Sequence, residues 1–154
     1  MGTKTTNYDF WMPEINDDEN QWGSMLNSNW DLLDGLLLTL TGESKSIIIE
    51  NPTATENISY FYTDVAVTVS RLLAVLVGSA TPSVTWTIRF GPDRSGAGTE
   101  IVTGGTVTTS ITTGSDVTVL DEPAIPAGSH VWVETTAQSG TVDSIIINLF
   151  YNED

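Results

Sequence analysis

Residues 83–91 read SVTWTIRFG, and this stretch decides the fold class. Apolar side chains occupy every second position from Val84 to Phe90, with Thr or Arg between them. A period of two is typical of a β-strand that has one buried face and one face in water. Similar segments, rich in β-branched and aromatic residues and separated by turn residues, recur along the chain. The expected strands are Ser46–Glu50, Ile58–Thr63, Val65–Ser70, Leu72–Gly78, Ser83–Gly91, Thr99–Thr103, Thr106–Ser110, Val117–Leu120, His130–Ala137 and Val142–Tyr151. So many short strands predict an all-β domain, a jelly-roll-like β-sandwich.

Two of these segments carry large side chains on both strand faces. Residues 145–151 read IIINLFY, which is typical of a strand that is covered on both sides. Residues 60–62 read YFY, so at least one aromatic ring faces outward unless another chain covers it. Because exposed tyrosine rings stack on sugars, Tyr60 and Tyr62 are the candidates for contact with a glycan. Trp86 and Trp132 stand mid-strand in alternating patterns, and we expect both in the core.

The charge of the chain excludes two classes of partner. Five Lys and Arg stand against twenty Asp and Glu among 154 residues, a formal net charge of -15. Proteins bind phosphate backbones and anionic lipid through Lys and Arg, so nucleic acid and membrane surfaces are poor partners. The absence of Cys excludes disulfides, thiolate metal sites and a thiol nucleophile. The first ten residues lack the apolar run of a secretory signal, and no apolar stretch has the length of a membrane span.

The composition changes near Thr41 and Gly42, which predicts two parts, residues 1–43 and 44–154. The first part holds three of the five Trp and is rich in Asn, Asp and Leu, whereas Thr, Val, Ile, Ser and Gly dominate the second. Asn16 followed by acidic residues, with Glu19 in capping-box position, predicts the start of a helix that ends at Gly42. We therefore expect an extended N-terminal arm, one helix and then the sandwich.

This helix carries a wide apolar stripe. One heptad seam consists of Leu26, Trp30, Leu33, Leu37 and Leu40, and an adjoining seam of Trp22, Leu26, Leu33, Leu36 and Leu40 is broken at Asn29. An isolated helix is marginally stable in water, so the stripe must pack on something. It can lie on the domain's own sheet, dock into a foreign protein or associate with other copies. We favour self-association into a three-helix bundle, because a wide stripe with Asn29 in a seam suits three helices better than two.

Few residues offer catalytic chemistry. His130 is the one His, and no Gly-x-Ser-x-Gly elbow is present, so a Ser–His–Asp site is not expected. Asp121-Glu122 and Glu134 are more simply solvated acids than a catalytic carboxylate pair. Residues 91–98 are glycine-rich without the ending of a phosphate-binding loop and are expected to form a flexible loop tip, and residues 17–19 lack EF-hand spacing. We predict that the protein is not an enzyme and has no metal site and no cofactor.

The N-terminal segment resembles the opening of many bacteriophage virion proteins described as tail fibres, head fibres or structural proteins. The shared pattern is TTNY at residues 5–8, Pro13, WG at 22–23, LN at 26–27, Asn29 and an acidic-apolar turn at 31–34. The sequence departs from that pattern at residues 9–12, where DFWM replaces small and polar residues. The C-terminal region, with IPAGS at 125–129, VWV at 131–133 and SGTV at 139–142, is similar to the ends of phage fibre and decoration sandwiches.

This resemblance implies an N-terminal segment that anchors the protein to the virion and forms trimers, with a variable part behind it. We expect a virion structural protein assembled in the bacterial cytoplasm, and favour a homotrimeric capsid decoration protein of the cement or head-fibre type. The chain has no repeat or long coiled coil that forms the shaft of a receptor-binding fibre. A short tail fibre, a tail-fibre adaptor and a module that binds a host glycan through Tyr60, Tyr62 or the loop at residues 91–98 are the alternatives. Expected partners are further copies of the chain and phage capsid or tail proteins. The expected anchoring and oligomerisation residues are Tyr8, Trp11, Trp22, Leu26, Trp30, Leu33, Leu37 and Leu40.

Overall fold

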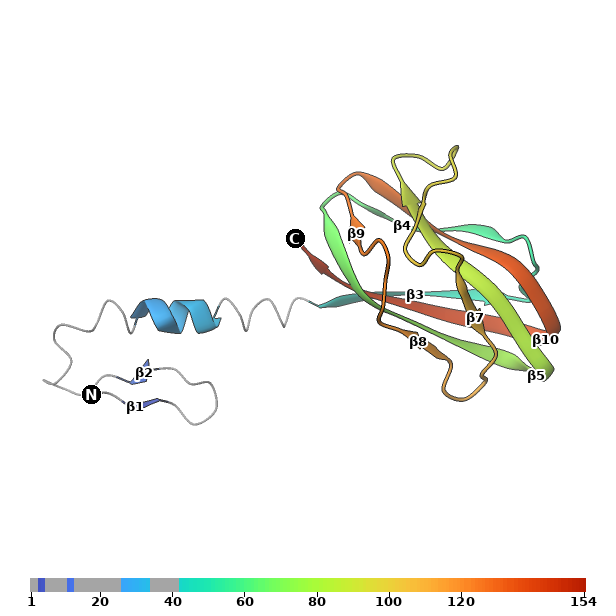
Figure 1. Cartoon of the computed structure of the whole chain (residues 1–154), viewed down its shortest axis with the longest axis horizontal. Coiled ribbons are helices and arrows are strands. Elements are labelled where there is room, and N and C mark those ends of the chain that lie inside the picture. The colour runs from blue at the N-terminus through green and yellow to red at the C-terminus, as the bar shows by residue number, and fades with distance from the viewer. Residues whose placement is uncertain (1–2, 5–10, 13–25, 34–41) are drawn as a thin grey trace, which may run out of the picture. The chain divides into compact units, whose positions relative to one another are not determined.

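A computed structural model of the chain describes residues 3–4, 11–12, 26–33 and 42–154. The chain divides into two compact units, Met1–Gly42 and Glu43–Asp154. In the first unit β1 (Thr3–Lys4) pairs antiparallel with β2 (Trp11–Met12), and residues 26–33 form a helix (Figure 1). The remainder of the predicted helix lies outside the described residues. The β1–β2 pair was missed by sequence reasoning, because strands of two residues are too short to show a period of two.

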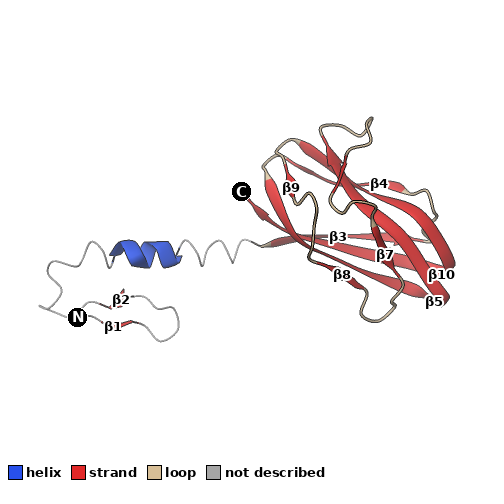
Figure 2. Ribbon diagram, viewed as in Figure 1, coloured by secondary structure: helices blue, strands red, loops and turns tan. Residues whose placement is uncertain are grey.

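The second unit consists of β-strands joined by turns and loops (Figure 2). The strands are β3 (Glu43–Glu50), β4 (Asn57–Thr63), β5 (Val67–Gly91), β6 (Thr99–Glu100), β7 (Thr106–Thr108), β8 (Ser115–Val117), β9 (Ala124–Ile125) and β10 (Ser129–Glu153). β5 and β10 pair antiparallel along almost their whole length, from Gly91 opposite His130 to Val67 opposite Glu153. β3 and β4 pair with the other edge of β10, and β6 to β9 with the other edge of β5, so all these strands form a single antiparallel sheet.

The long β5–β10 pair bends in its middle, so the sheet folds over on itself. Half-sheet A contains β3, residues 141–153 of β10, residues 67–79 of β5, β8 and β9. Half-sheet B contains β4, residues 129–139 of β10, residues 83–91 of β5, β6 and β7. The ladder is irregular between them, and Ala80, Thr81 and Gly140 have positive φ values of 56°, 55° and 70° there. Such β-bulges kink a strand and increase its twist, which turns the two halves toward each other.

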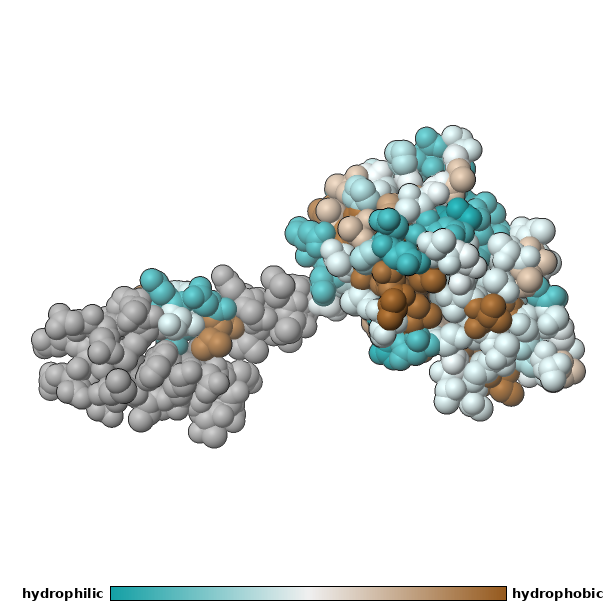
Figure 3. Space-filling view, viewed as in Figure 1, coloured by the Kyte–Doolittle hydropathy of each residue, from teal (hydrophilic) through white to brown (hydrophobic). Residues whose placement is uncertain are grey.

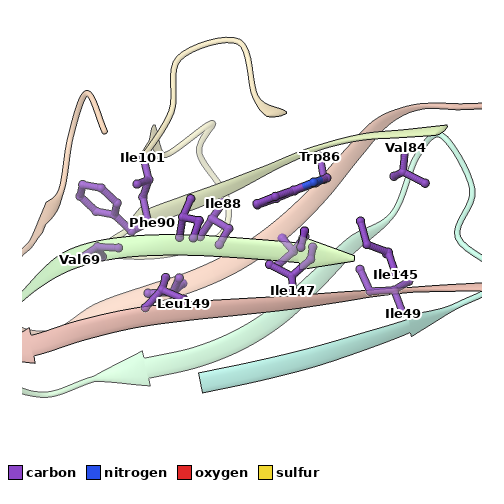
Figure 4. Packing of buried hydrophobic residues seen from close by; sticks show 14 of the residues in the cluster. Ile49, Val69, Val84, Trp86, Ile88, Phe90, Ile101, Ile145, Ile147 and Leu149 are labelled. Atoms are coloured by element: carbon purple, nitrogen blue, oxygen red, sulfur yellow. The ribbon is translucent and has the colours of Figure 1, made fainter. Parts of the chain in front are cut away.

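One hydrophobic core fills the space between the half-sheets. Figure 4 shows Trp86 and Ile88 of half-sheet B across from Ile147 and Leu149 of half-sheet A, and all four side chains are fully buried. The indole Nε1 of Trp86 donates a hydrogen bond to the Thr108 hydroxyl at 2.9 Å, so the ring is buried without losing its polar partner. The predicted all-β, sandwich-like architecture with one helix is therefore confirmed.

Several predicted strand boundaries were wrong. The three strands expected at residues 65–70, 72–78 and 83–91 form the continuous strand β5, and those expected at 130–137 and 142–151 form β10. The Gly, Ser and Pro residues that resemble strand ends in the sequence lie at the irregular positions of a ladder that continues past them. β6 and β7 are shorter than expected. β8 (Ser115–Val117) shares only Val117 with the strand expected at 117–120, and β9 lies where no strand was expected.

Candidate functional site

The apolar side of the helical segment is the first candidate site. Leu26, Trp30 and Leu33 follow one another at spacings of four and three, which places them on the same side of a helix. Leu26 is 52% exposed and Trp30 is 56% exposed, and with Asn29 and Leu33 they line an open apolar hollow. Large apolar side chains gathered and exposed in this way are typical of a surface that another protein surface covers.

The other predicted anchoring residues extend beyond this helical segment. Trp11 lies in β2, where it is opposite Lys4. Tyr8, Trp22, Leu37 and Leu40 lie outside the described residues. The structure thus brings together Leu26, Trp30 and Leu33 of the predicted set.

Tyr60, one of the two tyrosines predicted to contact a glycan, faces inward. A bulge in β4, opposite Val131 and Trp132 of β10, leaves Tyr60 without a directly opposed residue in the ladder. Its hydroxyl donates to the backbone oxygen of Lys45 at 2.6 Å and to that of Ile147 at 3.1 Å. Burial raises the pKa of the Tyr60 hydroxyl well above its ordinary value. These contacts join β4 to half-sheet A and leave Tyr60 little surface for a ligand.

Tyr62 is the tyrosine of this pair that is open to solvent. Its ring is 57% exposed and lies edge-on to the ring of His130, with 4.9 Å between the centroids. Nearby, an open hollow of about 370 Å³ is lined by Phe90, Gly91, Pro92, Thr99, Pro126, Ala127, Gly128 and Ser129. Its lining is made of apolar, Gly and hydroxyl residues without a charged side chain, so it offers few polar groups that would orient a sugar.

Glu134 belongs to an ionic network on the outer face of half-sheet B. Arg89 Nε donates to Glu134 Oε2 at 2.8 Å, and a second Arg89 nitrogen donates to Glu100 Oε1 at 2.5 Å. Asp121, the partner considered for Glu134 in a catalytic pair, instead accepts a hydrogen bond from the backbone N–H of Thr103 at 2.8 Å. Arg89 therefore pairs with two carboxylates and ties β5 to both β6 and β10.

The loop at residues 91–98 covers Trp132. Two expectations were therefore wrong: that Trp132 lies in the core, and that this loop is a flexible tip. Trp132 is buried, but it lies on the outer face of half-sheet B, because its neighbours Val131 and Val133 are the ones that enter the core. The guanidinium carbon of Arg94 lies 5.9 Å from the Trp132 ring centroid, and Arg94 donates to the backbone oxygen of Asn57 at 3.1 Å. The loop is thus tied to β4 rather than free, a contact between segments far apart in the sequence that no local pattern reveals.

Two kinds of site are not found in the part of the chain that the structure describes. None of its groups of His, Asp and Glu has three members placed to hold a metal ion. None of its helices combines the length and the apolar character needed to cross a membrane.

Comparison with known proteins adds no relative: neither a family model nor a curated protein matches the chain. The function is therefore inferred from the residues and their geometry.

Proposed function

We propose that this protein is a non-enzymatic structural component of a bacteriophage virion, a homotrimer anchored by its N-terminal segment. Within that class we favour capsid decoration, with the jelly-roll-like sandwich displayed outward. The observation that carries the proposal is the apolar side formed by Leu26, Trp30 and Leu33, on which Leu26 and Trp30 are exposed and Leu33 is half-buried. It lies inside the segment whose sequence resembles the opening of phage virion proteins.

Self-association is expected because exposing the apolar side of the helix to water is unfavourable in free energy. Burying a side chain of the size of Leu or Trp contributes about 1.5 to 3 kcal/mol. A short helix that exposes Leu26 and Trp30 therefore gains stability when copies pack these side chains together. When three equivalent helices pack around one axis, each copy can bury its Leu26, Trp30 and Leu33 side chains against the other two.

In the second unit, the first strand begins and the last strand ends at the same end of the sandwich. The chain enters it at Glu43, which accepts a hydrogen bond from the Tyr151 hydroxyl at 2.6 Å, close to the end of β10. The backbone N–H of Asp154 donates to the backbone oxygen of Ala66, just before β5. Figure 1 shows the start of β3 and the C-terminus at the same end of this unit. The turns at residues 51–56, 80–82 and 138–140 lie at the other end, which is free to point away from a particle.

The charge distribution supports a protein displayed in many copies. Residues 42–154 contain thirteen Asp and Glu against four Lys and Arg, a net charge of -9. Arg71 and Arg89 form ion pairs with Asp116, Glu100 and Glu134, so the uncompensated charge of the unit is negative. Like charge on neighbouring particles limits their aggregation.

The proposal is tested by the copy number of the protein in purified virions, measured by quantitative mass spectrometry against the major capsid protein. We expect a copy number comparable with that of the capsid protein, because decoration follows the capsid lattice. A copy number far below it, of the kind that a tail or a single vertex carries, would favour the tail-fibre or adaptor alternative. Absence of the protein from virions would contradict the whole proposal.

A further inference from the structure

Trp132 is a large aromatic ring on a polar face of the sheet. In the ladder it lies between Ser59 of β4 and Arg89 of β5, so the three side chains share the outer face of half-sheet B. Its indole Nε1 donates to Glu134 Oε1 at 2.8 Å, which fixes the orientation of the ring. The core uses the opposite face of the sheet, so packing of the interior does not account for this ring. An aromatic ring fixed among a few polar side chains is typical of a ligand site.

The loop at residues 91–98 covers this ring through contacts that are mainly polar. The loop is exposed from its second residue onward, and Figure 3 shows it at the top of the unit as mostly neutral and hydrophilic surface. Arg94 lies over the Trp132 ring and donates to the Asn57 side chain, to the Asn57 backbone oxygen and to the Ser59 hydroxyl. A segment held by hydrogen bonds at the surface opens locally at a small cost in free energy.

Opening of the loop frees hydrogen-bonding groups on both sides of the Trp132 ring. On one side, the groups of β4 to which Arg94 donates in the closed loop become available. On the other side, Arg89 Nη1 loses the backbone oxygen of Ala97, to which it donates at 3.0 Å, and becomes a free donor. The open face therefore combines one aromatic ring with donors and acceptors along its two edges.

We propose that the outer face around Trp132 is a binding site for an uncharged sugar ring, and that the loop at residues 91–98 is its lid. A sugar ring has an apolar face that stacks on an aromatic ring, and a rim of hydroxyl groups that bond to donors and acceptors. In the closed chain Arg94 occupies the place of the ligand. The inference goes beyond the proposed structural role and does not depend on it.

The charges of this face favour a neutral ligand over an ionic one. Both oxygens of Glu134 already accept hydrogen bonds, and both oxygens of Glu100 do so as well, so neither carboxylate is left to pair with an added cation. An anion is repelled by a unit that contains thirteen Asp and Glu against four Lys and Arg. A neutral sugar meets neither obstacle.

Fluorine NMR of the full-length chain labelled with fluorotryptophan tests the site. The resonance of Trp132 is assigned by its loss in Trp132→Phe. The probes are maltohexaose, cellohexaose and the hexamer of N-acetylglucosamine, with arginine amide as a cationic probe. We expect at least one of the saccharides, at millimolar concentration, to shift the Trp132 resonance. The resonance of Trp86, which is fully buried in the core, should stay unchanged and serves as the control in the same sample.

The substitution Arg94→Ala tests the lid. Since Arg94 competes with the sugar for the ring face, its removal should lower the apparent dissociation constant of the saccharide by about tenfold. The matched control is Arg71→Ala, which removes an Arg of half-sheet A that pairs with Asp116 and should leave the saccharide affinity unchanged. Melting followed by circular dichroism verifies that each variant is folded.

Three results would count against the inference. If no saccharide shifts the Trp132 resonance, in the wild-type chain or in Arg94→Ala, the sugar site is overturned. A shift with arginine amide alone would assign the face to a cationic ligand and overturn the sugar site as well. Equal saccharide affinities of the wild-type chain and Arg94→Ala would overturn the role of the loop as a lid. The copy number of the protein in virions bears on none of these results, so this inference and the proposed function fail independently.

Discussion

At the scale of single residues, Tyr60 connects the two half-sheets. It stands on β4 in half-sheet B, and its hydroxyl reaches backbone oxygens of β3 and β10 in half-sheet A. The next residue, Phe61, stacks on Tyr151 with 6.0 Å between ring centroids. The edges of the folded sheet are thus joined by aromatic side chains rather than by a further strand.

The change Tyr60→Phe keeps the ring and removes the hydroxyl. The backbone oxygens of Lys45 and Ile147 then lose the single hydroxyl hydrogen that they share, and we expect the free energy of unfolding to fall by about 1 to 2 kcal/mol. Urea unfolding measures this change in the free energy of unfolding. The control is Tyr62→Phe, whose ring is largely exposed, and it should change stability by no more than about 0.5 kcal/mol. Equal effects of the two substitutions would show that the inward hydrogen bonds of Tyr60 contribute nothing.

The same residue produces alkaline sensitivity. Burial raises the pKa of Tyr60 in the folded chain above the ordinary value of 10.0, so folding favours the neutral hydroxyl. The contribution of Tyr60 to the free energy of unfolding is therefore complete below pH 10. It is lost as the pH rises above 10, because the Tyr60 hydroxyl then ionises readily only in the unfolded chain. The melting temperature of Tyr60→Phe should accordingly fall less steeply above pH 10 than that of the wild-type chain. Parallel curves would contradict this assignment. Some slope should persist, since burial and Glu43 raise the pKa of Tyr151 as well.

At the scale of elements, the loop at residues 91–98 acts as a cover for Trp132. Gly98 has a φ of 65°, and a Cβ at this position would collide with the Trp132 ring and with the backbone oxygen of Phe90. At Gly96, in contrast, an added Cβ meets no atom within 4 Å. The two glycines of one loop therefore provide a matched pair.

We expect Gly98→Ala to destabilise the protein by about 2 kcal/mol or more, because it combines a strained backbone with a clash against a buried ring. Gly96→Ala should be close to neutral. Thermal unfolding measures the difference, and tryptophan fluorescence reports whether the cover over Trp132 has opened. A folded Gly98→Ala variant with wild-type stability and emission would show that the loop does not pack on Trp132.

At the scale of the whole molecule, assembly depends on the helical segment. Replacing Trp30 and Leu33 together by Asp places charges on the apolar side, and we expect the chain to lose self-association in sedimentation experiments. The second unit has its own core, so its melting transition and β-type circular dichroism should persist. The control Asn27→Asp adds a charge at an exposed helical position outside the apolar side. Persistence of the oligomer in the double variant would show that other surfaces hold the copies together.

The sequence by itself determined the all-β class, the strand character of residues 83–91 and the helix at residues 26–33. These features follow from periods of two and 3.6 residues, which are properties of neighbouring residues. Only the tertiary structure decided that β5 and β10 each continue through a bend, because a bulge and a strand end have the same local composition of Gly, Ser and Pro. It also decided the inward turn of Tyr60 and the burial of Trp132 beneath a loop, since both depend on segments distant in sequence. Which apolar face becomes core and which stays exposed was likewise decided by how the sheet folds over on itself.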